Sequence, residues 1–152
     1  MQGVYDEIVL KDADLTSTTP VEFPAVLSPI DVYRWGLIFT TAKDATAFSC
    51  QINLHETPGA AETTPEVMGL YSNAAAVAQG TTVYFEAGDS EFNAGGDPVD
   101  GPLQLDAGQQ LAFECADAAV AGVADVFIQY RRRPFTGARG PDLTLVTKGT
   151  LA

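Results

Sequence analysis

PLQLDAGQQLAFECADAAVAGVADVFIQYRRR, residues 102–133, is the stretch that decides the fold class. Apolar residues occupy alternate positions on both sides of the turn at 106–109, namely Leu103, Leu105, Leu111, Phe113 and Cys115. A period of two places such side chains on one face of a β-sheet. After a small, polar turn at 116–122, residues 125–130 alternate in the same way, and Pro134 lacks the N–H group that a continuing central strand needs. The stretch therefore predicts short antiparallel strands joined by turns.

Other parts of the chain repeat this pattern. Residues 46–55 show the cleanest alternation, residues 32–41 form a strand candidate around the only tryptophan, and residues 82–87 form another. Residues 67–79 are ambiguous, because their alanines also allow a helical turn. About eight short strands with regular turns predict an all-β fold, a two-sheet antiparallel sandwich or a barrel, and both a jelly-roll-like and an immunoglobulin-like sandwich are compatible with the pattern. The predicted core consists of Phe48, Cys50, Ile52, Leu54, Leu111, Phe113, Cys115, Val126, Ile128 and Tyr130.

The 152 residues fit a single domain with extended terminal arms. We expect an N-terminal arm and proline-rich extended segment at 1–31, a sandwich at 32–133 and a C-terminal arm at 134–152. Within the first segment, the strand candidate Val4 to Leu10 allows residues 1–20 to be either a terminal arm or an edge strand. The arms carry apolar residues that could either add as strands to neighbouring chains or fold back on their own sandwich. These residues are Val4, Tyr5, Val21, Phe23, Phe135, Leu143 and Leu145.

The charge of the chain restricts its partners. Twenty acidic residues against eight basic ones give a net charge of −12, which repels nucleic acid and anionic membranes. The first residues include acids and no long apolar run, so the sequence predicts neither a signal peptide nor a membrane span. We therefore expect the chain to be made in a cytoplasm. We expect no nucleic-acid partner and no membrane partner.

Half of the basic residues gather near the C-terminal end, at Arg131, Arg132, Arg133 and Arg139. Strand alternation places Arg131 and Arg133 on one face and Arg132 on the other. One interpretation is neutralisation of the protein's own carboxylates. The other is docking to an acidic partner surface, with the apolar arm residues Val4, Tyr5, Phe23 and Phe135 as further contacts.

Residue types for catalysis or tight metal binding are scarce. His55 is the only histidine, so a catalytic triad would have to combine it with Ser49 or Ser90, and no nucleophile-elbow motif is present. We predict no enzyme activity and no cofactor. Asp89, Glu91, Asn93 and Asp100 occupy positions 1, 3, 5 and 12 of a calcium-loop template. Ala94 stands where that template has glycine, so the expectation is a weak calcium candidate or simply a solvated acidic loop.

The two cysteines, Cys50 and Cys115, each lie within an apolar strand pattern. Buried free thiols are the favoured interpretation. A disulfide between them would need a specific geometry that alternation alone does not define.

The turn Leu105-Asp-Ala-Gly108, which leads into Leu111-Ala-Phe113, and the turn at 118–122, which leads into Asp125-Val-Phe-Ile-Gln-Tyr130, carry a family resemblance. Through them, residues 80–132 resemble the capsid decoration, or cement, proteins of tailed bacteriophages. The resemblance implies a jelly-roll virion structural protein, commonly a homotrimer. Such a protein sits on the capsid exterior, binds the major capsid protein and stabilises the shell by bridging subunits. It implies no catalytic residue.

The alternative function is a carbohydrate-binding β-sandwich module on a virion surface or tail. Such a module would present exposed aromatic residues to a sugar, with calcium at 89–100. Its candidate aromatic residues are Trp35, Tyr71, Tyr84 and Phe92.

Overall fold

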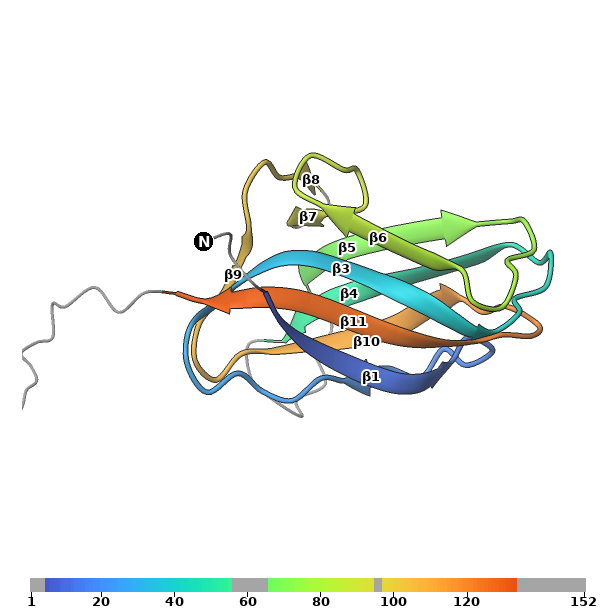
Figure 1. The fold of residues 1–152 in the computed structure, drawn as a ribbon, viewed down its shortest axis with the longest axis horizontal. Coiled ribbons are helices and arrows are strands. Elements are labelled where there is room, and N and C mark those ends of the chain that lie inside the picture. The colour runs from blue at the N-terminus through green and yellow to red at the C-terminus, as the bar shows by residue number, and fades with distance from the viewer. Residues whose placement is uncertain (1–4, 56–65, 95–96, 134–152) are drawn as a thin grey trace, which may run out of the picture.

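The computed structural model describes residues 5–55, 66–94 and 97–133, which form two antiparallel sheets packed face to face (Figure 1). The first sheet has the order β1-β11-β3-β6, with β9 also paired to β3. Its strands are β1 (Asp6–Asp14), β11 (Val123–Arg132), β3 (Ile30–Thr41), β6 (Thr82–Glu86) and β9 (Leu103–Leu105). The second sheet has the order β2-β10-β4-β5, from β2 (Val21–Glu22), β10 (Gln110–Asp117), β4 (Phe48–His55) and β5 (Glu66–Asn73). A small hairpin pairs β7 (Asn93–Ala94) with β8 (Asp97–Pro98).

The strand pairing is that of a jelly roll. With the short β7, β8 and β9 set aside, the chain pairs like one long hairpin: β1 with β11, β2 with β10, β3 with β6 and β4 with β5. Winding this hairpin into two sheets produces the observed strand orders. The predicted all-β sandwich is confirmed, and the pairing of the first strand with the last selects the jelly roll over the immunoglobulin-like arrangement.

The core lies between the sheets and contains the residues that the alternation predicts. Nine of the ten are at most 5% exposed, while Tyr130 is half-buried and packs against them. Strand β3 adds Trp35, Leu37 and Phe39 to this core, and these residues are at most 1% exposed. The interior is therefore apolar from both sheets, as burial of alternate strand positions requires.

The N-terminal segment belongs to the sandwich, so the predicted arm over 1–31 is wrong and the edge-strand alternative for 1–20 is the one observed. β1 pairs with β11 from Asp6 opposite Tyr130 to Asp14 opposite Val123. Phe23 and Val26 are buried in the core. The physical reason is that β3 pairs with only one edge of β11, so β1 can pair with the other edge. The apolar residues Phe23 and Val26, which follow β2, cover the open side of the sandwich. Residues 1–4 and the predicted C-terminal arm at 134–152 lie outside the described residues.

Candidate docking surface

A β-bulge determines which side chains β3 presents on the outer face of the first sheet. Gln129 pairs with Arg34 whereas Tyr130 pairs with Val32, so Tyr33 is the extra residue of the bulge. Because a bulge interrupts alternation, Tyr33 and Arg34 both lie on the outer face, between the buried Val32 and Trp35. The result is an aromatic and cationic surface at the end of the sheet where β11 finishes.

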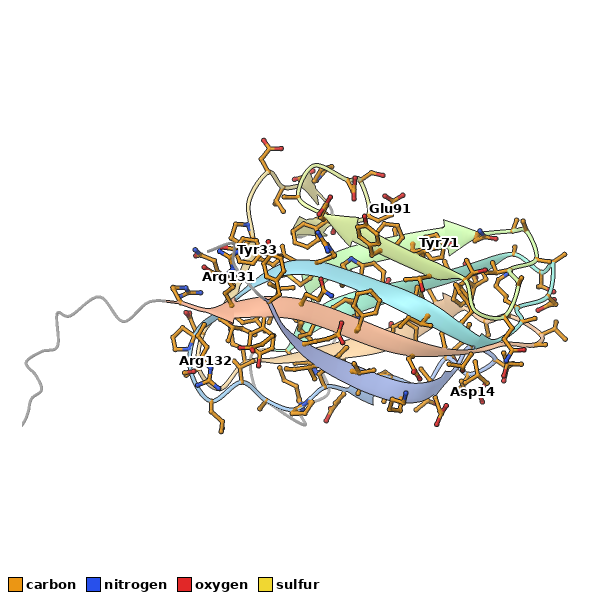
Figure 2. All side chains as sticks on the ribbon, in the orientation of Figure 1. Asp14, Tyr33, Tyr71, Glu91, Arg131 and Arg132 are labelled. Carbon is orange, nitrogen blue, oxygen red and sulfur yellow. The ribbon has the colours of Figure 1, made fainter. Side chains whose placement is uncertain are left out.

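Arg131 of β11 is held on this surface by two tyrosine rings. Its guanidinium carbon lies 4.7 Å from the ring centroid of Tyr5 and 5.3 Å from that of Tyr33, and the two ring centroids are 5.2 Å apart. Figure 2 shows Tyr33 and Arg131 side by side at this end of the sheet. The guanidinium of Arg131 makes no ion pair or hydrogen bond with any described residue, and its buried Nε has no partner there. The side chain is thus oriented by cation–π contacts, while its terminal Nη donors are unpaired among the described residues.

Arg34 lies on the same surface but is already paired. Its guanidinium donates to Glu86 at 2.8 Å and to Gln129 at 3.2 Å, and its guanidinium carbon lies 4.8 Å from the ring centroid of Tyr84. Gln129 in turn donates to Glu7 at 3.1 Å, so a polar row crosses β1, β11, β3 and β6. These hydrogen bonds hold Arg34 in place on the surface. Tyr84, which is 51% exposed, lies at the rim of the same surface. We call Tyr5, Tyr33, Arg34, Tyr84 and Arg131 the tyrosine–arginine surface.

Arg133 neutralises the protein's own carboxylates, so one of the four predicted docking arginines has an internal role. Its Nε donates to Asp31 at 3.0 Å and its Nη1 to Asp106 at 3.3 Å. The hydrogen bond to Asp31, with that to Asp106, raises the pKa of Arg133 above its usual value. Arg132 is exposed on the other side of β11 from Arg131 (Figure 2). Arg139 lies outside the described residues.

The predicted apolar contacts have different outcomes. Tyr5 is half-buried within the tyrosine–arginine surface. Phe23 is 1% exposed, so its assignment as a partner contact is wrong. Its N–H donates to the carbonyl of Leu111 at 2.8 Å and its carbonyl accepts from Gln110 at 2.7 Å, which ties it to β10 with its ring in the core. Val4 and Phe135 fall outside the part of the chain that the structure describes.

The acidic loop after β6 acts as a structural turn. The carboxylate of Asp89 accepts the Glu86 N–H at 2.8 Å, and the Glu91 carbonyl accepts the Trp35 indole N–H at 3.0 Å. Asn93 donates to the carbonyl of Ser90 at 3.1 Å. Within residues 5–55, 66–94 and 97–133, no three His, Cys, Asp or Glu side chains gather where they could hold a metal ion. The calcium candidate Asp89, Glu91, Asn93 and Asp100 is therefore not assembled as a site.

The four aromatic residues of the carbohydrate alternative do not form an exposed platform. Trp35 and Phe92 are interior, at 1% and 0% exposure. Tyr71 is half-buried against Phe85, and burial raises the pKa of its hydroxyl. Tyr84 is the member of this set that faces solvent.

His55 and Ser49 lie far apart on one strand, and both cysteine thiols are buried. His55 is 8% exposed and lies six positions along strand β4 from Ser49, which corresponds to roughly 20 Å. Ser49 donates to Asp117 instead. Cys50 and Cys115 lie directly opposite each other as free, buried thiols. Burial raises the pKa of Cys115 to about 12 and that of Cys50 well above its usual value, so both are poor nucleophiles at neutral pH.

Sequence reasoning missed two features. Lys43 is 1% exposed, and its ammonium donates to the carbonyls of Asp44, Thr46 and Ala75 at 2.7, 2.8 and 3.1 Å. A lysine beside an aspartate in a turn gives no local signal of burial. The outward position of Tyr33 and Arg34 was also missed, because a bulge depends on register between strands that are far apart in the sequence.

Comparisons with known proteins do not assign the chain to a family. No protein-family model matches it, and no curated protein matches it either. In the described ranges, no helix has the length and hydrophobicity needed to cross a membrane.

Proposed function

We propose that this chain is a virion structural protein that docks on the outer surface of a phage capsid and stabilises the shell by bridging subunits. The observation that carries the proposal is Arg131, which is oriented by two tyrosine rings and has no charged partner among the described residues, on a chain whose net charge is −12. The resemblance of residues 80–132 to capsid decoration proteins supports it. The jelly-roll fold is compatible with it but occurs with many functions.

The mechanism is charge-assisted docking. The guanidinium of Arg131 is fixed between Tyr5 and Tyr33, so little conformational entropy is lost when a carboxylate of the partner pairs with it. Hydrogen bonds between ionised groups are stronger than those between neutral groups, and a carboxylate can accept two from one guanidinium. The acidic remainder of the chain repels an acidic surface that does not place its carboxylate opposite Arg131.

Symmetry then multiplies this contact. A decoration protein that is itself an oligomer, a homotrimer by resemblance, engages several subunits of the major capsid protein at once. Simultaneous engagement converts modest individual affinities into firm attachment. Attachment across several subunits opposes their separation, which is how such a protein would brace a filled shell.

The decisive experiment measures binding of the full chain to shells assembled from the major capsid protein of the same genome. Arg131→Glu should weaken attachment by roughly 10- to 100-fold, the effect of losing a hydrogen-bonded charge pair. Val120→Glu is the control, because it adds a negative charge at a 75% exposed position in the turn between β10 and β11, at the other end of β11 from Arg131, and should change attachment by less than about threefold.

Equal losses in the two variants would contradict a specific role for Arg131. Binding to polysaccharide but to no shell would replace the proposal by the carbohydrate-binding alternative.

A further inference from the structure

An apolar groove lies along one open side of the sandwich, between β1 and the segment that follows β2. Its volume is about 240 Å³. Its lining includes Ile8, Val26, Leu27, Ile30, Tyr130 and Arg132. Leu27, on its rim, is 95% exposed and extends the apolar surface of the groove into solvent. We call this feature the edge groove.

The edge groove lies beside a strand edge that has no partner among the described residues. β1 is an edge strand of its sheet, and within those residues it pairs with β11 alone. Figure 1 shows β1 along this margin of the sheet. The strand is distorted after Leu10, where the carboxylate of Asp125 holds Lys11 at 2.6 Å and the N–H of Asp12 at 2.9 Å. The regular part of the edge is therefore 6–10, the part beside the groove.

We propose that the edge groove binds residues 143–146 of a second copy of this chain, as a strand added to β1. Nineteen residues follow Arg133, and among them Leu143-Thr-Leu-Val146 alternates as a half-buried strand does. Leu143 and Leu145 would lie toward the groove while the backbone pairs with β1.

Charge favours this occupant. The C-terminal nineteen residues contain Arg139 and Lys148 against a single acid, Asp142, in a chain that is otherwise strongly acidic. The edge of β1 offers exposed Asp6 and Glu7. A basic, strand-forming segment beside an acidic strand edge is complementary in both charge and backbone hydrogen bonding.

Topology favours a second copy over the chain's own end. β11 is antiparallel to β1, so a segment that turned back after Arg133 would run parallel to β1 and would have to cross over it. Parallel pairing is slightly less stable per residue than antiparallel pairing, which the segment of a second copy can adopt because its direction is not tied to β11 of the same chain. Nineteen extended residues reach up to roughly 60 Å, enough to meet a neighbour, and such head-to-tail contacts close into a ring in a cyclic oligomer.

The test is the mass of the full chain in solution, measured by sedimentation over a range of concentrations. The unaltered chain should be oligomeric. Leu145→Asp on the donated segment and Leu27→Asp on the groove rim should each raise the dissociation constant by roughly 10- to 100-fold, the effect of losing one buried leucine. Thr144→Asn, which adds no charge on the opposite face of the segment, and Val120→Asp, at an exposed site in the turn between β10 and β11, are the controls and should leave the mass unchanged.

Amide hydrogen exchange provides a second readout, because the outward N–H groups of 6–10 should be protected in the oligomer and lose protection in Leu145→Asp. A monomeric unaltered chain, or an oligomer that survives both Leu145→Asp and Leu27→Asp, would overturn the proposal. So would equal dissociation by Thr144→Asn and Leu145→Asp. None of these outcomes depends on whether Arg131 binds a shell, so the two proposals fail separately.

Discussion

At the scale of single residues, neighbours in space decide what a charged side chain does. Arg131 and Arg133 are two positions apart on one chain, yet Arg133 is paired with Asp31 and Asp106 whereas Arg131 contacts tyrosine rings. The role of Asp44 is likewise set by its neighbours in space. Its carboxylate accepts hydrogen bonds from the hydroxyl and N–H of Thr46 and from the N–H groups of Val120 and Ala121, so it joins two turns at one end of the sandwich.

Asp44 should make the stability of the protein depend on acid pH. The hydrogen bond from the Thr46 hydroxyl, followed by that from the Ala121 N–H, lowers the pKa of Asp44 from 3.8 to about 2. A carboxylate with a lowered pKa stabilises the folded state fully above its unfolded pKa, and this stabilisation is lost as the pH falls through its folded pKa. We expect the stability difference between the unaltered chain and Asp44→Asn to be largest above about pH 4 and to shrink toward pH 2.

Urea denaturation at a series of pH values measures this difference. Glu22→Gln makes the same charge change at an exposed position and is the control. A difference for Asp44→Asn that stays constant between pH 5 and pH 2 would show that Asp44 contributes no proton-linked stability.

At the scale of elements, irregularities in the strands set the contacts between them. The bulge in β3 places Tyr33 and Arg34 together on the outer face. On the inner side, Gly69 of β5 leaves space for Trp35 of β3, whose indole N–H reaches the Glu91 carbonyl at 3.0 Å. The two sheets and the loop after β6 therefore meet at one tryptophan.

Replacing Gly69 by alanine should destabilise this junction by about 1–3 kcal/mol, the usual cost of overpacking a core. A Cβ at this position would lie 2.3 Å from Trp35 Nε1 and 2.6 Å from Cε2, so the indole or the strand must move. Chemical denaturation measures the loss, and the fluorescence of the only tryptophan reports the displacement.

The control for this substitution is Gly101→Ala, since a Cβ there meets no atom within 4 Å. It should not reduce stability. Equal effects of the two substitutions would mean that the Trp35 contact does not limit the packing of β5.

At the scale of the whole molecule, the jelly roll brings the two ends of the described chain together. β1 and β11 are separated by most of the sequence and are neighbours in one sheet. β1 also contributes the buried Ala13, and Leu15, which follows it, is fully buried. Because β1 pairs with β11, the fold depends on residues 6–14, which the sequence alone does not assign to the core.

Deleting residues 1–14 should therefore abolish cooperative thermal unfolding, because β11 would lose one of its two neighbours and the core would be exposed along the open side. Circular dichroism during heating is the measurement. Deleting residues 1–4 is the control, since every pair between β1 and β11 remains. If the longer deletion melted within a few degrees of the full chain, β1 would be dispensable.

The sequence by itself determined the fold class and most of the core. Alternation along 48–54, 111–115 and 126–130 follows from the two-residue repeat of an extended backbone, a local property that needs no knowledge of partners. The tertiary structure decided what depends on pairing between distant segments: the strand state of β5, the burial of Phe23 and Lys43, and the different roles of Arg131 and Arg133. These outcomes depend on which residue lies opposite in the neighbouring strand, and jelly-roll register sets that opposition across most of the length of the chain.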